Sequence, residues 1–93
     1  MTAESRVDPA LVTVTGVRVL SRYVLELVFD TGEVKVIDIE PMMWGPVFEP
    51  LRAYYGLFRQ VFADPDSGTI SWPNGADWAP DELYVKSKAA VPA

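Results

Sequence analysis

Three aspartates can supply the acid–base chemistry of this chain. Asp30, Asp38 and Asp77 are the polar residues most closely tied to its patterned stretches. Two such carboxylates, if folding brings them together, form a general acid/base pair or a Mg²⁺ site. Each position also has a structural explanation, because an aspartate can start a turn, accept hydrogen bonds from loop amides or cap a helix. The sequence favours the structural explanation and leaves the chemical one open.

A second group of residues is suited to binding a small molecule. Asn74 lies between Trp72 and Trp78, so that two aromatic walls and one orienting amide can line a pocket. Asn74 is also followed by Gly75, and Asn-Gly is a strong turn signal because both residues tolerate positive φ. The turn interpretation, with both tryptophans in the core, is favoured.

The residue types that are missing narrow the chemistry further. The chain has no histidine and no cysteine. This composition excludes Ser-His-Asp and Cys-His catalysis, histidine-ligated zinc or iron, and disulfides. We therefore predict a non-enzymatic protein with no metal and no cofactor. The alternative is a small-molecule-binding or weakly catalytic domain that uses Asp38, Asp77 and Asn74 near the tryptophans.

The charge of the chain argues against partners rich in phosphate. The 13 acidic residues outnumber the 8 basic ones, which gives a net charge of −5. The basic residues are scattered along the sequence, whereas a phosphate-binding surface needs them clustered. Bases can stack on tryptophans, but no basic groove accompanies them here. We expect no direct nucleic-acid binding, and a nucleic-acid-associated regulator is the third hypothesis.

One apolar group has no local structural reason. Met42, Met43 and Trp44 form an apolar loop, and Phe62 is expected to point outward from a strand. Adaptable methionines beside a tryptophan suit a protein-binding surface. The alternative is that the loop folds back and fills the core. The sequence does not decide between these two interpretations.

A single small domain has to position these residues. The 93 residues, 49% of them hydrophobic, are enough for one core. We expect a flexible leader over residues 1–10, one α+β domain over residues 11–86 and a flexible tail over residues 87–93. No signal peptide or membrane-spanning run is recognisable, which predicts a cytoplasmic protein that contacts no membrane.

The first half of the domain has the pattern of a β-meander. Strands are predicted over residues 12–20, 23–29 and 33–39, because β-branched residues are frequent and apolar residues alternate with polar ones. Gly16 predicts a bulge or a point of close packing in the first strand. The turn at 30–32 contains Gly32, which supplies a left-handed conformation. Exposed charges on the other face indicate that only one face of the sheet is covered.

The second half predicts helix, hairpin and helix. A short helix is expected over residues 46–54, ended by Gly56. A hairpin follows, with strands over residues 58–64 and 69–72, and the last helix spans residues 79–85. The fold class is therefore α+β, a two-layer β(3)-α-β(2)-α arrangement with a mostly antiparallel sheet and short helices on one side.

A set of motif residues occurs along the chain in a fixed order: Leu27, Phe29, Gly32, Asp38-Ile39, Phe48, Leu51 and, most specifically, the run from Ile70 to Asp77 followed by Pro80, Leu83 and Tyr84. With these residues the chain resembles a bacterial family, Domain of Unknown Function 2442. The resemblance covers about residues 12–85. The resemblance implies a small two-layer β(3)-α-β(2) fold and no catalytic residue. It also implies family members that stand alone, that precede a helix-turn-helix or that pair with another small protein in toxin–antitoxin systems.

These observations together predict a cytoplasmic protein-interaction module. Its partner is a second copy of the chain in a homodimer, a small co-encoded protein in an antitoxin-like or regulatory pair, or both. The predicted contact surface consists of Met42, Met43, Trp44 and Phe62. No helix-turn-helix pattern is recognisable, so the chain resembles the free-standing members.

Overall fold

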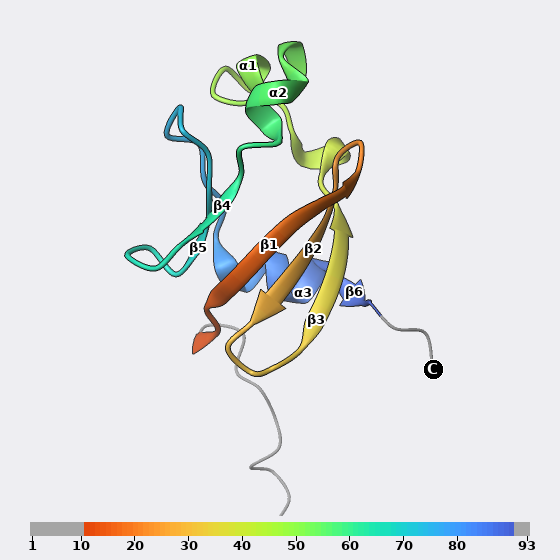
Figure 1. Cartoon of the computed structure of the whole chain (residues 1–93), viewed down its shortest axis with the longest axis vertical. Coiled ribbons are helices and arrows are strands. Elements are labelled where there is room, and N and C mark those ends of the chain that lie inside the picture. The colour runs from red at the N-terminus through yellow and green to blue at the C-terminus, as the bar shows by residue number, and fades with distance from the viewer. Residues whose placement is uncertain (1–10, 91–93) are drawn as a thin grey trace, which may run out of the picture.

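The computed structural model describes residues 11–90 of the chain, and Figure 1 shows their arrangement. The predicted leader at 1–10 and residues 91–93 of the predicted tail lie outside this range. The predicted α+β class is confirmed: short helices accompany a four-stranded antiparallel sheet and a separate two-stranded one. None of the helices within residues 11–90 is long and apolar enough to cross a membrane.

The predicted meander forms the larger sheet. Its strands pair antiparallel in the order β1-β2-β3-β6, with bounds β1 Val14–Ser21, β2 Val24–Phe29, β3 Val34–Asp38 and β6 Lys88–Ala89. The register of β1 shifts between Val14 and Gly16, which confirms the predicted bulge. Gly32 has a φ of 90°, as the turn between β2 and β3 requires.

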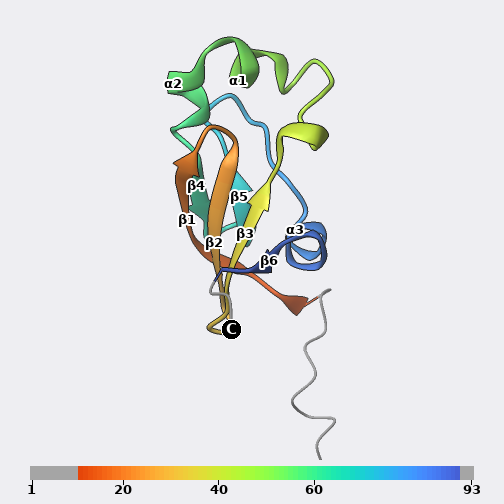
Figure 2. The same ribbon diagram turned by 90° about the vertical axis from the view of Figure 1, so that its right-hand side faces the viewer.

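Alternation along β2 places one set of apolar side chains in the core. Leu25, Leu27 and Phe29 are buried, and α3 (Pro80–Lys86) covers this face. Leu83 of α3 is fully buried, and the ring of Tyr84 meets that of Phe29 edge-on, 5.0 Å between centroids. Figure 2 shows α3 beside one face of the sheet. The last helix therefore packs against the sheet, as predicted.

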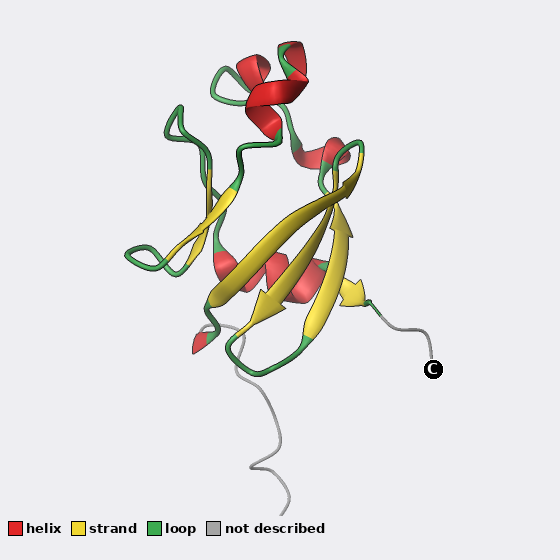
Figure 3. Cartoon of the chain, in the orientation of Figure 1, coloured by secondary structure: helices red, strands yellow, loops and turns green. Residues whose placement is uncertain are grey.

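The segment after β3 differs from the single helix predicted over 46–54. It contains η3 (Glu40–Met42), α1 (Glu49–Ala53) and α2 (Tyr55–Phe58), with α1 and α2 at one end of the molecule (Figure 3). Gly56 does not end a helix but lies inside α2, and the break falls at Tyr54, which is extended at φ −127° and ψ 96°. The break directs the Phe58 ring into the core, where it is fully buried.

The second hairpin forms the smaller sheet. Strands β4 (Phe62–Asp64) and β5 (Thr69–Ser71) pair antiparallel, which confirms the predicted pairing. The predicted start at residue 58 is wrong, because Phe58 belongs to α2. The Val14 N–H donates to the Gly68 carbonyl at 2.9 Å and ties this hairpin to the start of β1.

The strand β6 was not part of the predicted fold. Residues 88 and 89 pair with Val36 and Lys35, and the Ala90 N–H donates to the Val34 carbonyl at 3.0 Å. A two-residue strand is too short to show alternation, so sequence pattern cannot reveal it. The start of the predicted tail therefore covers the outer edge of β3.

Candidate interaction site

The motif around Trp72 and Asn74 clamps the helical segment onto the rest of the domain. The buried Trp72 indole donates from Nε1 to the Phe58 carbonyl at 2.8 Å. The Asn74 amide donates from Nδ2 to the Val47 carbonyl at 3.0 Å, and its oxygen accepts from the Ala76 N–H at 3.2 Å. These bonds hold the two ends of the segment 47–58. The favoured structural interpretation of both residues agrees with this geometry.

Asp30 and Asp38 lie at opposite ends of the β2–β3 hairpin. Asp38 pairs with Val24 at the start of β2, whereas Asp30 follows its end. Five strand steps separate these ends, or about 17 Å, so the two carboxylates do not form an acid/base pair. Each has a structural role: Asp30 accepts from the Thr13 N–H at 3.2 Å, and Asp38 from the Glu40 N–H at 3.0 Å.

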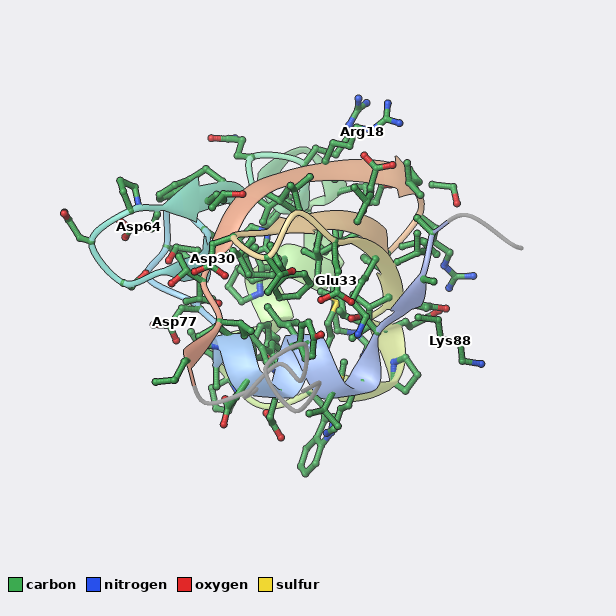
Figure 4. The ribbon with its side chains drawn as sticks, turned by 90° about the horizontal axis from the view of Figure 1, so that it is seen from below. Arg18, Asp30, Glu33, Asp64, Asp77 and Lys88 are labelled. Atoms are coloured by element: carbon green, nitrogen blue, oxygen red, sulfur yellow. The ribbon has the colours of Figure 1, made fainter. Side chains whose placement is uncertain are left out.

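Asp77 does not cap the last helix, which corrects that part of its structural explanation. The N-cap of α3 is Ala79, whose side chain makes no capping bond. Asp77 instead forms an isolated antiparallel bridge with Ser71, and its side chain lines a hollow near the start of α3. Figure 4 shows Asp77 at this end and Lys88 beyond the other end of the helix. No group of three potential metal-binding residues occurs among residues 11–90.

The apolar loop after β3 divides into a buried half and an exposed half. Met43 is fully buried in the core, so its predicted place on an interaction surface is wrong. The Arg52 guanidinium donates to the Met43 carbonyl at 2.7 Å and holds the loop in this position. Met42 is half-buried, whereas the Trp44 side chain is 77% exposed. The loop therefore fills the core at Met43, whereas Met42 and Trp44 stay accessible.

Trp44 borders an open cleft between this loop and α3, which we call the Trp44 cleft. Its volume is about 350 Å³, and it is lined by Pro41, Met42, Trp44, Gly45, Trp78, Glu82 and Lys86. A smaller hollow of about 180 Å³ shares Trp78 and Glu82 with it and is completed by Phe48, Asp77 and Ala79. The two hollows therefore adjoin at Trp78 and Glu82.

Polar contacts across the Trp44 cleft centre on Glu82. Its carboxylate accepts from the Trp78 indole Nε1 at 3.1 Å and pairs with Lys86 Nζ at 3.3 Å. Lys86 Nζ also lies 3.9 Å from the Met42 sulfur. The ion pair is solvent-exposed and one helical turn long, so that it contributes little to stability. The cleft therefore combines apolar surface with a carboxylate that is held only weakly.

Phe62 does not belong to the Trp44 cleft. It lies on β4, which contacts β1, and its side chain is 43% exposed. Trp44 follows β3, which β2 separates from β1 in the sheet. The predicted surface of four residues is thus reduced to Met42 and Trp44 in the cleft, with Phe62 at a separate place.

The sequence does not reveal Glu82 and Lys86 as lining residues of the cleft, and it suggests Trp78 only as a wall beside Asn74 and Trp72. Trp78, Glu82 and Lys86 are spaced four residues apart, the spacing that puts side chains on one side of a helix. This spacing is the sequence signal from which the three residues can be grouped. It does not indicate what they face, because the opposite wall of the cleft comes from a loop that has no periodicity.

Polar contacts of Tyr84 connect α3 to β3 and to the residue that precedes it. Lys35 Nζ donates to the Tyr84 carbonyl at 2.7 Å and lies 3.9 Å from the centre of the Tyr84 ring. The Tyr84 hydroxyl donates to Glu33 Oε1 at 2.5 Å. This hydrogen bond, supported by one from Thr31, lowers the pKa of the Glu33 carboxyl below its ordinary 4.5. The same bond raises the pKa of the Tyr84 phenol above 10.0.

Replacing this hydroxyl is expected to lower the melting temperature in a pH-dependent way. The lowered pKa of the Glu33 carboxyl stabilises the folded state above about pH 4.5. This stabilisation is lost as the pH falls through the folded pKa of that carboxyl. The raised phenol pKa stabilises the folded state below about pH 10, and this stabilisation is lost as the pH rises through the folded pKa of the phenol. The melting temperatures of wild type and Tyr84→Phe should therefore differ most between these limits and converge in acid. Tyr54→Phe, at an exposed position, is the control; a constant difference across pH would contradict this assignment.

Comparison with known proteins gives one finding. A family model described as "Protein of unknown function (DUF2442)" matches residues 14–89, which is most of the chain. No curated protein and no solved structure matches the chain.

Proposed function

We infer a function from the premise that this chain belongs to the DUF2442 family of proteins of unknown function. We propose a protein-interaction module without catalytic activity that docks a protein partner in the Trp44 cleft. The partner is another small protein in an antitoxin-like or regulatory pair, which is one of the arrangements that the family resemblance implies. The cytoplasmic location predicted from the sequence is part of this proposal.

The exposure of Trp44 carries the proposal. The indoles of Trp72 and Trp78 both donate hydrogen bonds, whereas among residues 11–90 the Trp44 indole has no hydrogen-bond partner. Its side chain is 77% exposed beside a cleft that it helps to line. Tryptophan is enriched among the residues that dominate binding energy at protein interfaces. A large aromatic side chain with no role in the fold is explained by a partner that covers it.

Affinity capture from cells of the source organism tests the proposal. Removing the Trp44 side chain should cost at least about 2 kcal/mol of binding free energy, or roughly thirtyfold in affinity. A protein bound stoichiometrically to wild type should therefore be lost from Trp44→Ala in quantitative mass spectrometry.

Tyr54→Ala is the matched control, because its aromatic side chain is 69% exposed but lies outside the cleft. This variant should keep the partner. Equal recovery of every bound protein by wild type and both variants would refute the Trp44 cleft as the docking site.

A further inference from the structure

The chemistry of the Trp44 cleft indicates which kind of partner segment it receives. Two of its walls are the indoles of Trp44 and Trp78, whose faces attract cations through the ring quadrupole. The Met42 sulfur adds a polarisable contact, and the Glu82 carboxylate supplies the charge. Aromatic faces beside a carboxylate form a site for an arginine or lysine side chain.

The chain's own Lys86 already places a cation beside the Glu82 carboxylate and the Met42 sulfur. Its ammonium group lies 3.3 Å from a Glu82 oxygen and 3.9 Å from the Met42 sulfur. The ion pair joins two side chains that are each about half exposed, so an incoming cation can replace Lys86 at little cost. A guanidinium group in particular forms two parallel hydrogen bonds to a carboxylate, which an ammonium group cannot do.

The charge around the cleft favours a basic partner over a second copy of this chain. Asp77 lines the adjoining hollow, and within residues 11–90 its side chain has no ion-pair partner. The whole chain carries a net charge of −5, so two copies repel each other. An oppositely charged partner is attracted and oriented by the same field.

We propose that the Trp44 cleft receives a basic segment of the partner protein, whose arginine or lysine side chain lies against Trp44 and Trp78 and pairs with Glu82. This inference rests on the proposed function and adds the chemical class of the docking segment. The adjoining hollow, with Asp77 at its edge, takes the neighbouring residue of that segment.

Peptide titration of the ¹⁵N-labelled full chain tests the inference. The probe is the acetylated and amidated pentapeptide Gly-Arg-Leu-Arg-Gly, added at low ionic strength. The indole N–H signals of Trp44 and Trp78 should shift, and that of the buried Trp72 should not. The same peptide with citrulline in place of arginine keeps the shape without the charge. It should bind about tenfold more weakly, and a glutamate version should not bind.

Two variants with the same change in net charge show whether the Glu82 carboxylate itself attracts the arginine peptide. Glu82→Gln keeps an oxygen that accepts from the Trp78 indole but removes the charge, and it should weaken arginine-peptide binding about tenfold. Asp66→Asn, in the turn between β4 and β5, should leave the affinity unchanged. Equal loss in both variants, or equal affinity for the citrulline peptide, would overturn the inference.

The outcomes of the two experiments are distinguishable. If capture depends on Trp44 while the arginine peptide shifts no indole signal, the cationic docking segment is wrong and the interaction module remains. If capture is also independent of Trp44, the docking site itself is wrong and both proposals fall.

Discussion

Trp72→Ala is expected to destabilise the fold by about 3–5 kcal/mol, the cost of removing a large aromatic side chain from a core. The Trp72 side chain is 2% exposed, and its ring lies 5.8 Å from that of Phe58 and 6.2 Å from that of Phe48, centroid to centroid. Its indole also holds the Phe58 carbonyl, which alanine would leave without this donor. A domain of this size has a total stability of about 5–14 kcal/mol. Much of the stability should therefore be lost.

Urea denaturation of wild type and Trp72→Ala measures this loss directly. Trp72→Phe keeps a buried aromatic ring, although a smaller one, and removes the indole N–H donor. It should be less damaging than the alanine substitution. A midpoint for Trp72→Ala equal to that of wild type would show that the clamp on the segment 47–58 does not hold the fold together.

The second large effect concerns two adjacent residues with opposite outcomes. Met43→Ala should cost about 2–5 kcal/mol, because a fully buried methionine side chain is removed from a closed core. Trp44→Ala should change the stability by no more than about 0.5 kcal/mol, as exposed substitutions do. Thermal unfolding of the two variants tests this split. Similar destabilisation in both would mean that Trp44 packs against the domain and is not available to a partner.

The sequence predicts the meander because its signals are local. Leu25, Leu27 and Phe29 alternate with less buried residues in β2, and Gly32 has the conformation that its turn demands. The helical segment escapes prediction for the opposite reason. The break at Tyr54 allows Phe58 to pack into a core formed by distant strands. No neighbouring residue in the sequence indicates this break.

The candidate site is predictable only where its signals are local. Trp44 is recognisable as an apolar residue without a local role, but its neighbour Met43 has the same character and is buried. Met43 faces the core in a loop that is tied by the Arg52 bond to the Met43 carbonyl, a contact between residues nine positions apart. The cleft itself requires α3 beside the loop after β3, an arrangement that only the tertiary fold creates.

Photocrosslinking in living cells shows whether a protein partner covers Trp44. The photoreactive residue p-benzoylphenylalanine is introduced in place of Trp44 and, as a control, in place of the exposed Tyr54. We expect one covalent adduct of defined mass from the Trp44 position, with a second protein joined at that residue, and none from the Tyr54 position. The absence of an adduct at Trp44, or the same adducts at both positions, would refute the docking of a partner in the Trp44 cleft.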